Sequence, residues 1–340
     1  MYREVSLTQN LPLIFSKLFR RNQSHVNEIK PDAEQPYPEL QKLIHLFNSH
    51  KQIPEVLYLG DSVVERVSMH DSEQRTLGNM VIDSIKEDLS ADYISHSAYH
   101  FGLFHGFVRV LQRLKYRPKI LILPINLRSF SPQWDLSPLW QLEQEIQAVE
   151  QYLAKPRKRI PVIQPVVESP GLFDAFDATP SRYALSDFQY LGDFRNLIKT
   201  KPQTEEEKLF RLKQIFIFHY THLLELSHPK VRLIEETLDL LNQMKIKTLL
   251  YVTPVNYCAG TKYVGEAFLE IVQRNVDVVS TAIQEHLNSN MVHFLDYSRL
   301  LTSDYFFHEN DPTEHLNQEG RAQLAAKLSQ ATIGLNQASL

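Results

Sequence analysis

The chain has 340 residues, of which 43% are hydrophobic and 22% charged, and its formal net charge at pH 7 is −4. This length allows one large core, or a core with a sizeable insertion. The charge is close to neutral, without the basic surplus typical of nucleic-acid-binding proteins, so no nucleic-acid partner is expected. Cys258 is the single cysteine and cannot form a disulfide within the chain, which fits a reducing compartment.

The amino-terminal region lacks an apolar run long enough for a signal-peptide core or a membrane span. We therefore expect a soluble, cytoplasmic protein without stable membrane insertion. Residues 14–21 have the pattern of a short amphipathic basic helix, for which packing on the domain is favoured over membrane association. Pro31, Pro36 and Pro38 indicate a linker, so residues 1–40 are interpreted as an N-terminal extension.

Short apolar runs then alternate with helical patterns. Strands are predicted at 56–59, where Gly60 ends the run, and at 92–95, 119–123, 247–252 and 291–295. Helices are predicted at 76–89, 101–114, 136–153 with Asp135 as its cap, 231–244, 266–287 and 317–329. Because alternating strands and helices build a parallel sheet covered on both faces, the predicted fold class is a three-layer α/β/α sandwich with a central parallel sheet.

The regular alternation stops between residues 155 and 227, a region rich in prolines and aromatic residues. We interpret it as a mostly helical insertion, with a helix at 208–226, into an α/β domain formed by 41–154 and 228–335. An insertion after the third strand would lie near the ligand crevice. Three interpretations are possible: a lid, an acceptor-binding element, or a helical subdomain that packs or dimerises. The third includes a homo-oligomer among the possible assemblies.

Two motifs near the two ends of the predicted domain contain candidate catalytic residues. In parallel sheets the ligand site lies beyond the carboxyl ends of the strands. Gly60-Asp61-Ser62 follows the first strand, and a serine that opens a helix lies near N–H groups that stabilise negative charge. Asp311 and His315 precede the last helix, where a histidine can accept the serine proton while a carboxylate orients its ring. The alternatives are that Ser62 is only a helix cap, and that His315 is exposed before a helix capped by Asn317.

A third motif follows the third strand, where the Asn126 amide can donate to an oxyanion, although a loop asparagine in a turn is the common alternative. The three motifs come in order, each beyond a different strand. Together they resemble the SGNH (GDSL-like) hydrolase superfamily, over roughly residues 56–328 except 155–227. The resemblance implies a flavodoxin-like sheet, Ser62 as nucleophile, and His315 as general base and acid. It also implies Asn126 and the Ser62 N–H as oxyanion donors.

The sequence departs from the family pattern at two places. The family's acid lies three residues before the histidine, where this chain has Pro312, so Asp311 is the predicted acid, with Asp296 and Asp304 as weaker candidates. The glycine that supplies an oxyanion N–H in the family's second block corresponds either to Ala98 or, with a shifted alignment, to Gly102.

Four further residues are candidates for substrate binding, namely Asp61, His96, Arg128 and Trp134. Arg128 can hold an anionic group or form a salt bridge. Trp134, with Phe130 and Trp140, can form an apolar platform for an acyl group or sugar, or pack in the core. The histidines lack metal-ligand spacing and no glycine-rich nucleotide motif is present, so no metal and no cofactor are expected.

The sequence therefore predicts a serine-dependent esterase that forms an acyl-enzyme with a small-molecule or glycan ester. One alternative is an O-acyltransferase, in which a sugar or other hydroxyl replaces water as acceptor. The other is a non-catalytic binding or scaffold protein on the same fold, because fold alone does not determine activity. Serine-dependent turnover would separate the enzymes from the binding protein.

Overall fold

The computed structural model describes residues 37–48, 52–154 and 176–337. The amphipathic helix predicted at 14–21, the prolines Pro31 and Pro36, and residues 155–175 of the predicted insertion lie outside these ranges. Five parallel strands form one sheet in the order β2-β1-β3-β4-β5. The strands are β1 (Val56–Gly60), β2 (Ala91–Ser95), β3 (Ile120–Ile125), β4 (Lys247–Val252) and β5 (Val292–Asp296). The predicted α/β fold with a parallel sheet flanked by helices is confirmed.

The strands are buried because each carries apolar side chains on both faces. In β1, Leu57 and Leu59 face one hydrophobic cluster and Tyr58 faces another, as the two-residue period of a strand requires. The chain builds β2 on one side of β1 and then β3 to β5 on the other. The carboxyl ends of β1 and β3 are therefore the topological switch point, where such sheets bind their ligands.

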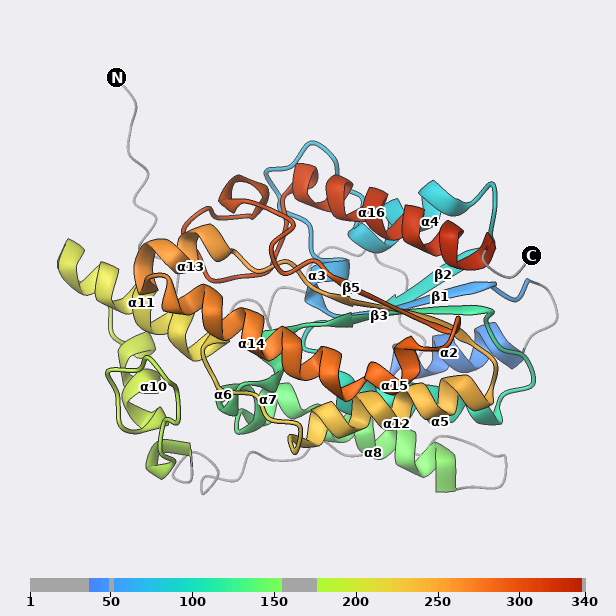
Figure 1. Ribbon diagram of the computed structural model, residues 1–340, viewed down its shortest axis with the longest axis horizontal. Coiled ribbons are helices and arrows are strands. Elements are labelled where there is room, and N and C mark those ends of the chain that lie inside the picture. Colours follow the sequence, from blue (N-terminus) through green and yellow to red (C-terminus); the bar gives the residue numbers. More distant parts are fainter. Residues whose placement is uncertain (1–36, 49–51, 155–175, 338–340) are drawn as a thin grey trace, which may run out of the picture.

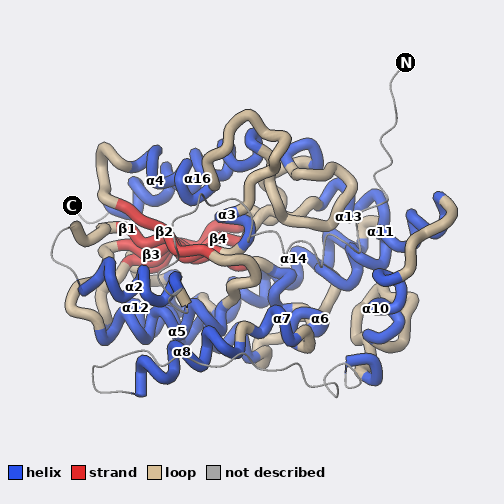
Figure 2. The backbone as a smooth tube through the Cα atoms, turned by 180° about the vertical axis from the view of Figure 1, so that it is seen from behind, coloured by secondary structure: helices blue, strands red, loops and turns tan. Residues whose placement is uncertain are grey.

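Helices cover both faces of the sheet, as Figures 1 and 2 show. The first face carries α3 (Ser62–Glu65), α4 (Leu77–Ile85) and α16 (Gln318–Gln337). The second face carries α2 (Pro38–Asn48), α5 (Phe101–Arg113), α8 (Glu143–Ala154), α12 (Pro229–Gln243), α13 (Tyr257–Val264) and α14 (Ala267–Ala282), with α15 (Gln284–Leu287) beside them. Within the described ranges, no helix is both long and apolar enough to cross a membrane.

The single helix predicted at 136–153 is wrong, because the chain forms two helices there, α7 (Pro138–Gln141) and α8. A further short helix, α6 (Pro132–Asp135), comes just before them. A proline has no N–H to continue a helix, and Leu142 adopts a left-handed backbone with φ 52°, which ends α7. Asp135 is the last residue of α6 rather than a cap, and its carboxylate pairs with Lys230. Ser131 caps α6 instead.

The insertion contributes α10 (Leu191–Lys199) and α11 (Glu205–Tyr220) to the described structure. α11 begins three residues before the predicted helix because Thr204 and Glu207 form a reciprocal capping box, and it ends at Tyr220. Figure 1 shows α10 and α11 at the end of the molecule toward which the strands point. Phe216 and Tyr220 of α11 belong to the main core. This helix is therefore part of the wall beyond the strand ends, not a separate body.

Candidate active site

Ser62 lies at the start of α3, directly beyond β1. A side chain at Gly60 would have its Cβ 2.4 Å from Val64, so the tight exit from the strand requires glycine. The Asp61 carboxylate caps α3 by accepting from the Val63 N–H at 2.9 Å. Ser62 is therefore not the cap, and its hydroxyl is left for another partner. That partner is His315, whose Nε2 lies 3.1 Å from Ser62 Oγ.

The segment before α16 holds His315 in place. Phe307 donates its N–H to the His315 carbonyl at 2.9 Å, and their rings lie 5.6 Å apart. Asn317 accepts from the Gly320 N–H at 3.0 Å and so caps α16, as the sequence allowed. His315 is nevertheless half-buried and faces Ser62, so the alternative of an exposed histidine does not hold.

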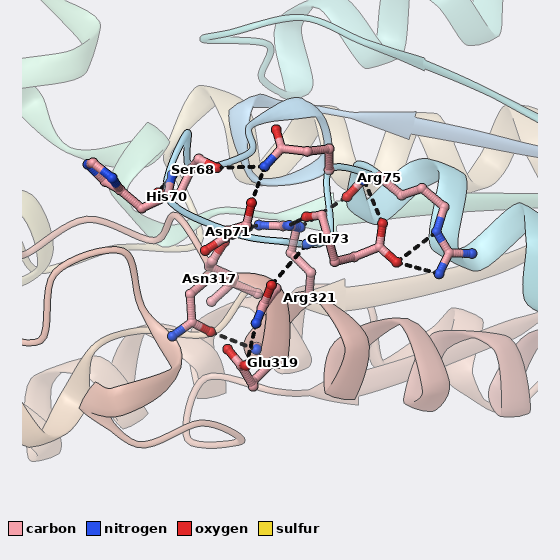
Figure 3. Close-up of polar contacts among 12 residues, drawn as sticks. Ser68, His70, Asp71, Glu73, Arg75, Asn317, Glu319 and Arg321 are labelled. Carbon is pink, nitrogen blue, oxygen red and sulfur yellow. Dashed lines mark hydrogen bonds and ion pairs between the residues drawn. The ribbon is translucent and has the colours of Figure 1, made fainter.

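A buried arginine connects this segment to the loop that follows α3 (Figure 3). Arg321 is fully buried, and its Nη1 donates to the Leu316 carbonyl at 2.9 Å and to the Asp71 carboxylate at 2.7 Å. Its Nη2 donates to the Glu73 carbonyl at 2.7 Å. Because Leu316 follows His315 directly, these bonds fix the histidine relative to the loop that extends from the serine helix.

The electrostatic environment keeps the His315 ring neutral near pH 7. Desolvation lowers the pKa of His315 to about 3, the Glu314 carboxylate opposes this, and the charges of Arg66 and Arg128 add to the lowering. A neutral imidazole can accept the Ser62 proton on Nε2 when its own proton is on Nδ1. The pair can therefore act as nucleophile and base.

Glu314 is the buried anion nearest in sequence to His315. It is 2% exposed and accepts from Arg128 Nη1 at 3.3 and 3.4 Å, from Asn126 Nδ2 at 3.0 Å and from the Tyr220 hydroxyl at 3.3 Å. Burial alone would raise the pKa of Glu314, but Arg128 and then His315 lower it to about 2. Glu314 is therefore ionised at neutral pH, and its charge favours the imidazolium that forms when His315 takes a proton.

The structure does not bring Asp311 to His315. The Asp311 main chain is held in a turn. Its carbonyl accepts from Asn256 Nδ2 at 3.1 Å, and its N–H donates to the His308 carbonyl. Within the described ranges no carboxylate hydrogen-bonds the His315 ring. Asp296 accepts from Ser298 and Asp304 from Thr302 instead. The assignment of Asp311 as the acid thus stays a prediction without a supporting contact.

A substitution can test whether Asp311 is the catalytic acid. Because Asp311 does not contact the ring, Asp311→Asn should lower kcat by less than about 10-fold, whereas loss of a hydrogen-bonded triad acid costs about 10⁴-fold. The measurement is kcat on an ester that the wild type hydrolyses, with thermal unfolding as the control for folding. A loss near 10⁴-fold in a folded Asp311→Asn variant would restore Asp311 as the acid.

Asn126 lies beyond β3 with its amide engaged by carboxylates. Its Nδ2 donates to Asp61 Oδ2 at 2.9 Å and to Glu314 at 3.0 Å, while its Oδ1 accepts from the Arg128 N–H at 3.1 Å. Both amide hydrogens are thus committed, and the oxyanion role of Asn126 stays a prediction. Burial raises the pKa of Asp61 to about 7 despite the hydrogen bond from Asn126.

The other predicted oxyanion donors are the main-chain N–H groups of Ser62 and Ala98. Within the described ranges neither N–H donates a hydrogen bond to another backbone group. Ala98 has φ 70°, the left-handed region that favours glycine, which is the residue of the family pattern. Gly102 instead lies inside α5, where its N–H donates to His100 Nδ1 at 3.0 Å. The loop from His96 to Ala98 lies beside Ser62 because Gly60 pairs with Ser95.

The other candidate substrate-binding residues have structural partners. Arg128 forms the ion pair with Glu314, and its guanidinium lies over the Trp134 and Trp140 rings at 5.5 and 5.6 Å. Trp134 is buried, as core packing requires, and its ring lies 4.7 Å from that of Trp140. His96 Nδ1 lies 2.9 Å from the Ser97 carbonyl.

Tyr220, Glu314 and Arg66 were missed as site residues by the sequence analysis. Tyr220 comes from the insertion, whose path no motif predicts. Glu314 carries a usable signal, since neighbours in an extended segment point in opposite directions, so a residue beside His315 faces away from Ser62 and inward. Within the described ranges, no group of three or more histidine, cysteine or acidic residues is placed to bind a metal.

Three buried histidines and the half-buried His315 should make the fold sensitive to acid. Burial lowers the pKa of His100, His219, His222 and His315 from 6.5 to about 3. Between these values the unfolded chain binds protons that the native chain does not, so stability falls as the pH drops from about 6.5 toward 3. Each histidine adds a slope of about 1.4 kcal/mol per pH unit.

Urea unfolding at pH 7.5, 6, 5 and 4 measures this dependence. His222→Phe is the informative variant, since neither ring nitrogen of His222 has a partner within the described structure. We expect this variant to flatten the slope by about one proton. A midpoint that stays constant or rises between pH 7 and pH 5 would contradict the assignment of these histidines as neutral.

No protein-family model matches the sequence, and no curated protein sequence matches it. Similar solved structures include an acetylxylan esterase from Geobacillus stearothermophilus, with 10% identity, 84% of this chain and 94% of the other covered, and a TM-score of 0.38. An aryl esterase of M. smegmatis has 11% identity over 82% and 98%, with a TM-score of 0.35. A GDSL-like lipase from Bacteroides thetaiotaomicron has 10% identity over 97% and 98%, with a TM-score of 0.35.

Similarity this low does not carry an activity from one protein to another, so function has to be inferred from the residues of this chain. What the structure shows of this chain is a five-stranded parallel sheet flanked by helices, with Ser62 and His315 in contact beyond its strands.

Proposed function

We propose that this protein is a serine-dependent esterase in which Ser62 is the nucleophile and His315 the general base. The observation that carries the proposal is the 3.1 Å contact between Ser62 Oγ and His315 Nε2. It lies at the switch point of the sheet, where open α/β sheets bind their ligands. The lowered pKa of His315 means that its ring is neutral at pH 7, the state in which Nε2 can accept a proton.

The reaction follows from this geometry. His315 Nε2 takes the Ser62 proton while Oγ attacks the ester carbonyl, and the N–H groups of Ser62 and Ala98 stabilise the tetrahedral oxyanion. Collapse breaks the ester bond, and the alkoxide leaves with the proton from His315. Water then attacks the acyl-enzyme as His315 takes its proton, and Ser62 is released. The Glu314 anion stabilises the imidazolium formed in each step.

An ester hydrolase assay tests the proposal. 4-Nitrophenyl acetate and acetylated xylooligosaccharides serve as substrates for the wild type, Ser62→Ala and His315→Ala. Ser68→Ala is the matched control, because Ser68 lies in the loop after α3 and, among the residues that the structure describes, its hydroxyl accepts only from the nearby His70 N–H. We expect turnover in the wild type and the control alone. Turnover that survives Ser62→Ala would contradict the proposal.

The same assay separates hydrolysis from transfer. Tyr220 and His219 of α11 lie at the Pro312 carbonyl, and the Tyr220 hydroxyl also reaches Glu314, so the insertion contacts the segment that carries His315. If an added sugar or alcohol acceptor takes most of the acyl group, the enzyme is an O-acyltransferase that uses the same Ser62 step. A folded protein with no serine-dependent turnover would favour the non-catalytic alternative.

A further inference from the structure

We propose that Arg66 recognises an anionic group on the ester, so that the preferred substrates are esters carrying a carboxylate or similar anion near the reacting carbonyl. This inference rests on the proposed function and names its substrate class. Its starting point is the position of Arg66 at the end of the serine helix. The Arg66 N–H donates to the Ser62 carbonyl at 3.0 Å, which places the two residues one helical turn apart.

The Arg66 side chain lies against the loop that carries the second oxyanion N–H. Its Nη2 donates to Ser97 Oγ at 3.2 Å, and Ser97 in turn donates to the Glu65 carboxylate at 2.7 Å. Ser97 directly precedes Ala98, so the guanidinium is held beside the predicted oxyanion site. Among the cations acting on His315, Arg66 lowers its pKa most, ahead of Arg128. The Arg66 charge therefore acts on the Ser62–His315 pair.

Arg66 lacks the ion pair that other arginines in and near the site have. Within the described ranges, no carboxylate oxygen lies within 4.0 Å of its guanidinium nitrogens, and Glu65 reaches it only through the Ser97 hydroxyl. Arg128, by contrast, is paired with Glu314, and Arg321 with Asp71. Arg128 was the sequence candidate for binding an anion, but its partner is internal, which leaves Arg66 as the available cation.

The surroundings of Arg66 make the lack of a carboxylate partner in the described structure informative. The residue is half-buried, and desolvation lowers its pKa, while the charges of Glu65 and Glu314 oppose this lowering. A guanidinium has five N–H donors in a planar fork, and the structure uses one of them. A carboxylate or phosphate on the substrate would be bound by two parallel hydrogen bonds. An anion at this position would also lie within reach of the nucleophile.

Matched pairs of esters test the inference and show which part of the substrate carries the anion. 4-Nitrophenyl butyrate and mono-4-nitrophenyl succinate differ by a carboxylate on the acyl side. Phenyl acetate and 3-acetoxybenzoate differ by a carboxylate on the leaving-group side. We expect the wild type to prefer the anionic member of one pair. Arg66→Gln should then lower kcat/KM for that ester by roughly 10- to 100-fold, with the neutral ester changed less than about 3-fold.

Two further variants complete the design. Arg66→Lys keeps the charge but loses the fork, so we expect an intermediate loss. Arg75→Gln is the matched control, since Arg75 is an exposed arginine paired with Glu73 and Asp83, and it should behave as wild type. Thermal unfolding of each variant reports its folding.

The outcomes distinguish this inference from the proposed function. Two results would overturn the role of Arg66 while leaving the proposed function intact. One is Ser62-dependent turnover with no preference in either pair, and the other is an equal fall in kcat/KM for the anionic and neutral esters in Arg66→Gln. Absence of Ser62-dependent turnover for all four esters would overturn the proposed function and this inference with it.

Discussion

Replacing Ser62 by alanine should lower kcat/KM by at least about 10⁴-fold for any ester that the wild type hydrolyses. The loss is large because the acyl-enzyme cannot form without the Ser62 oxygen, and only binding and the oxyanion donors remain. Stability should change little, since the Asp61 carboxylate, and not Ser62, caps α3. His315→Ala should cause a similar loss by removing the proton acceptor 3.1 Å from Oγ.

The double variant Ser62→Ala/His315→Ala provides the sharper measurement. Residues that act as a unit lose their function together, so the double variant should be no slower than either single variant. Purified proteins are compared by kcat/KM on one ester, with circular dichroism as the control for folding. Losses that multiply in the double variant would show that the two residues act independently, which the direct contact argues against.

Glu314→Gln should destabilise the protein by about 3–5 kcal/mol, because it leaves the buried Arg128 charge without a partner. Glu314 and Arg128 are nearly inaccessible to solvent, at 2% and 8% exposed, so water does not replace the lost carboxylate. The variant also removes the anion that favours the protonated form of His315, so kcat should fall as well. Arg128→Met/Glu314→Gln removes both charges and should cost less than Glu314→Gln alone.

Urea unfolding of the wild type, Arg128→Met, Glu314→Gln and the double variant gives the coupling free energy between the two residues. Glu319→Gln is the matched control, since Glu319 is exposed at the start of α16, and it should change stability by less than about 0.5 kcal/mol. A Glu314→Gln cost below about 1 kcal/mol would mean that the pair is hydrated or dispensable. The role of Glu314 as a fixed buried anion would then be wrong.

The sheet was predictable because its strands are short, apolar and buried on both faces. Each predicted strand corresponds to a strand of the structure, and β4 has the predicted bounds. The region after β3 was predicted less well. Periodicity continues through 136–153, but Pro138 and the left-handed Leu142 divide it into separate helices. α13 was not predicted; it is eight residues long and begins directly after its cap Asn256, close behind β4.

The candidate site was predictable where its residues directly follow a strand or precede a helix, as Ser62, Asn126 and His315 do. The partners of these residues depend on tertiary contacts between distant segments. The Arg128–Glu314 pair spans 186 residues, and Tyr220 joins it from the insertion. Pattern alone could not decide that Arg128 faces Glu314 while Arg66 has no carboxylate partner. The supporting charges therefore had to come from the structure.

The most direct test of the central claim is covalent labelling of the native protein with a fluorophosphonate, followed by mass spectrometry of its peptides. An activated serine reacts because its oxygen attacks phosphorus as it attacks an ester carbonyl. We predict one modified site, at Ser62, with labelling absent in Ser62→Ala, strongly slowed in His315→Ala and unchanged in Ser68→Ala. A folded wild-type protein that stays unlabelled, or that is labelled equally in Ser62→Ala, would contradict the account of Ser62 as an activated nucleophile.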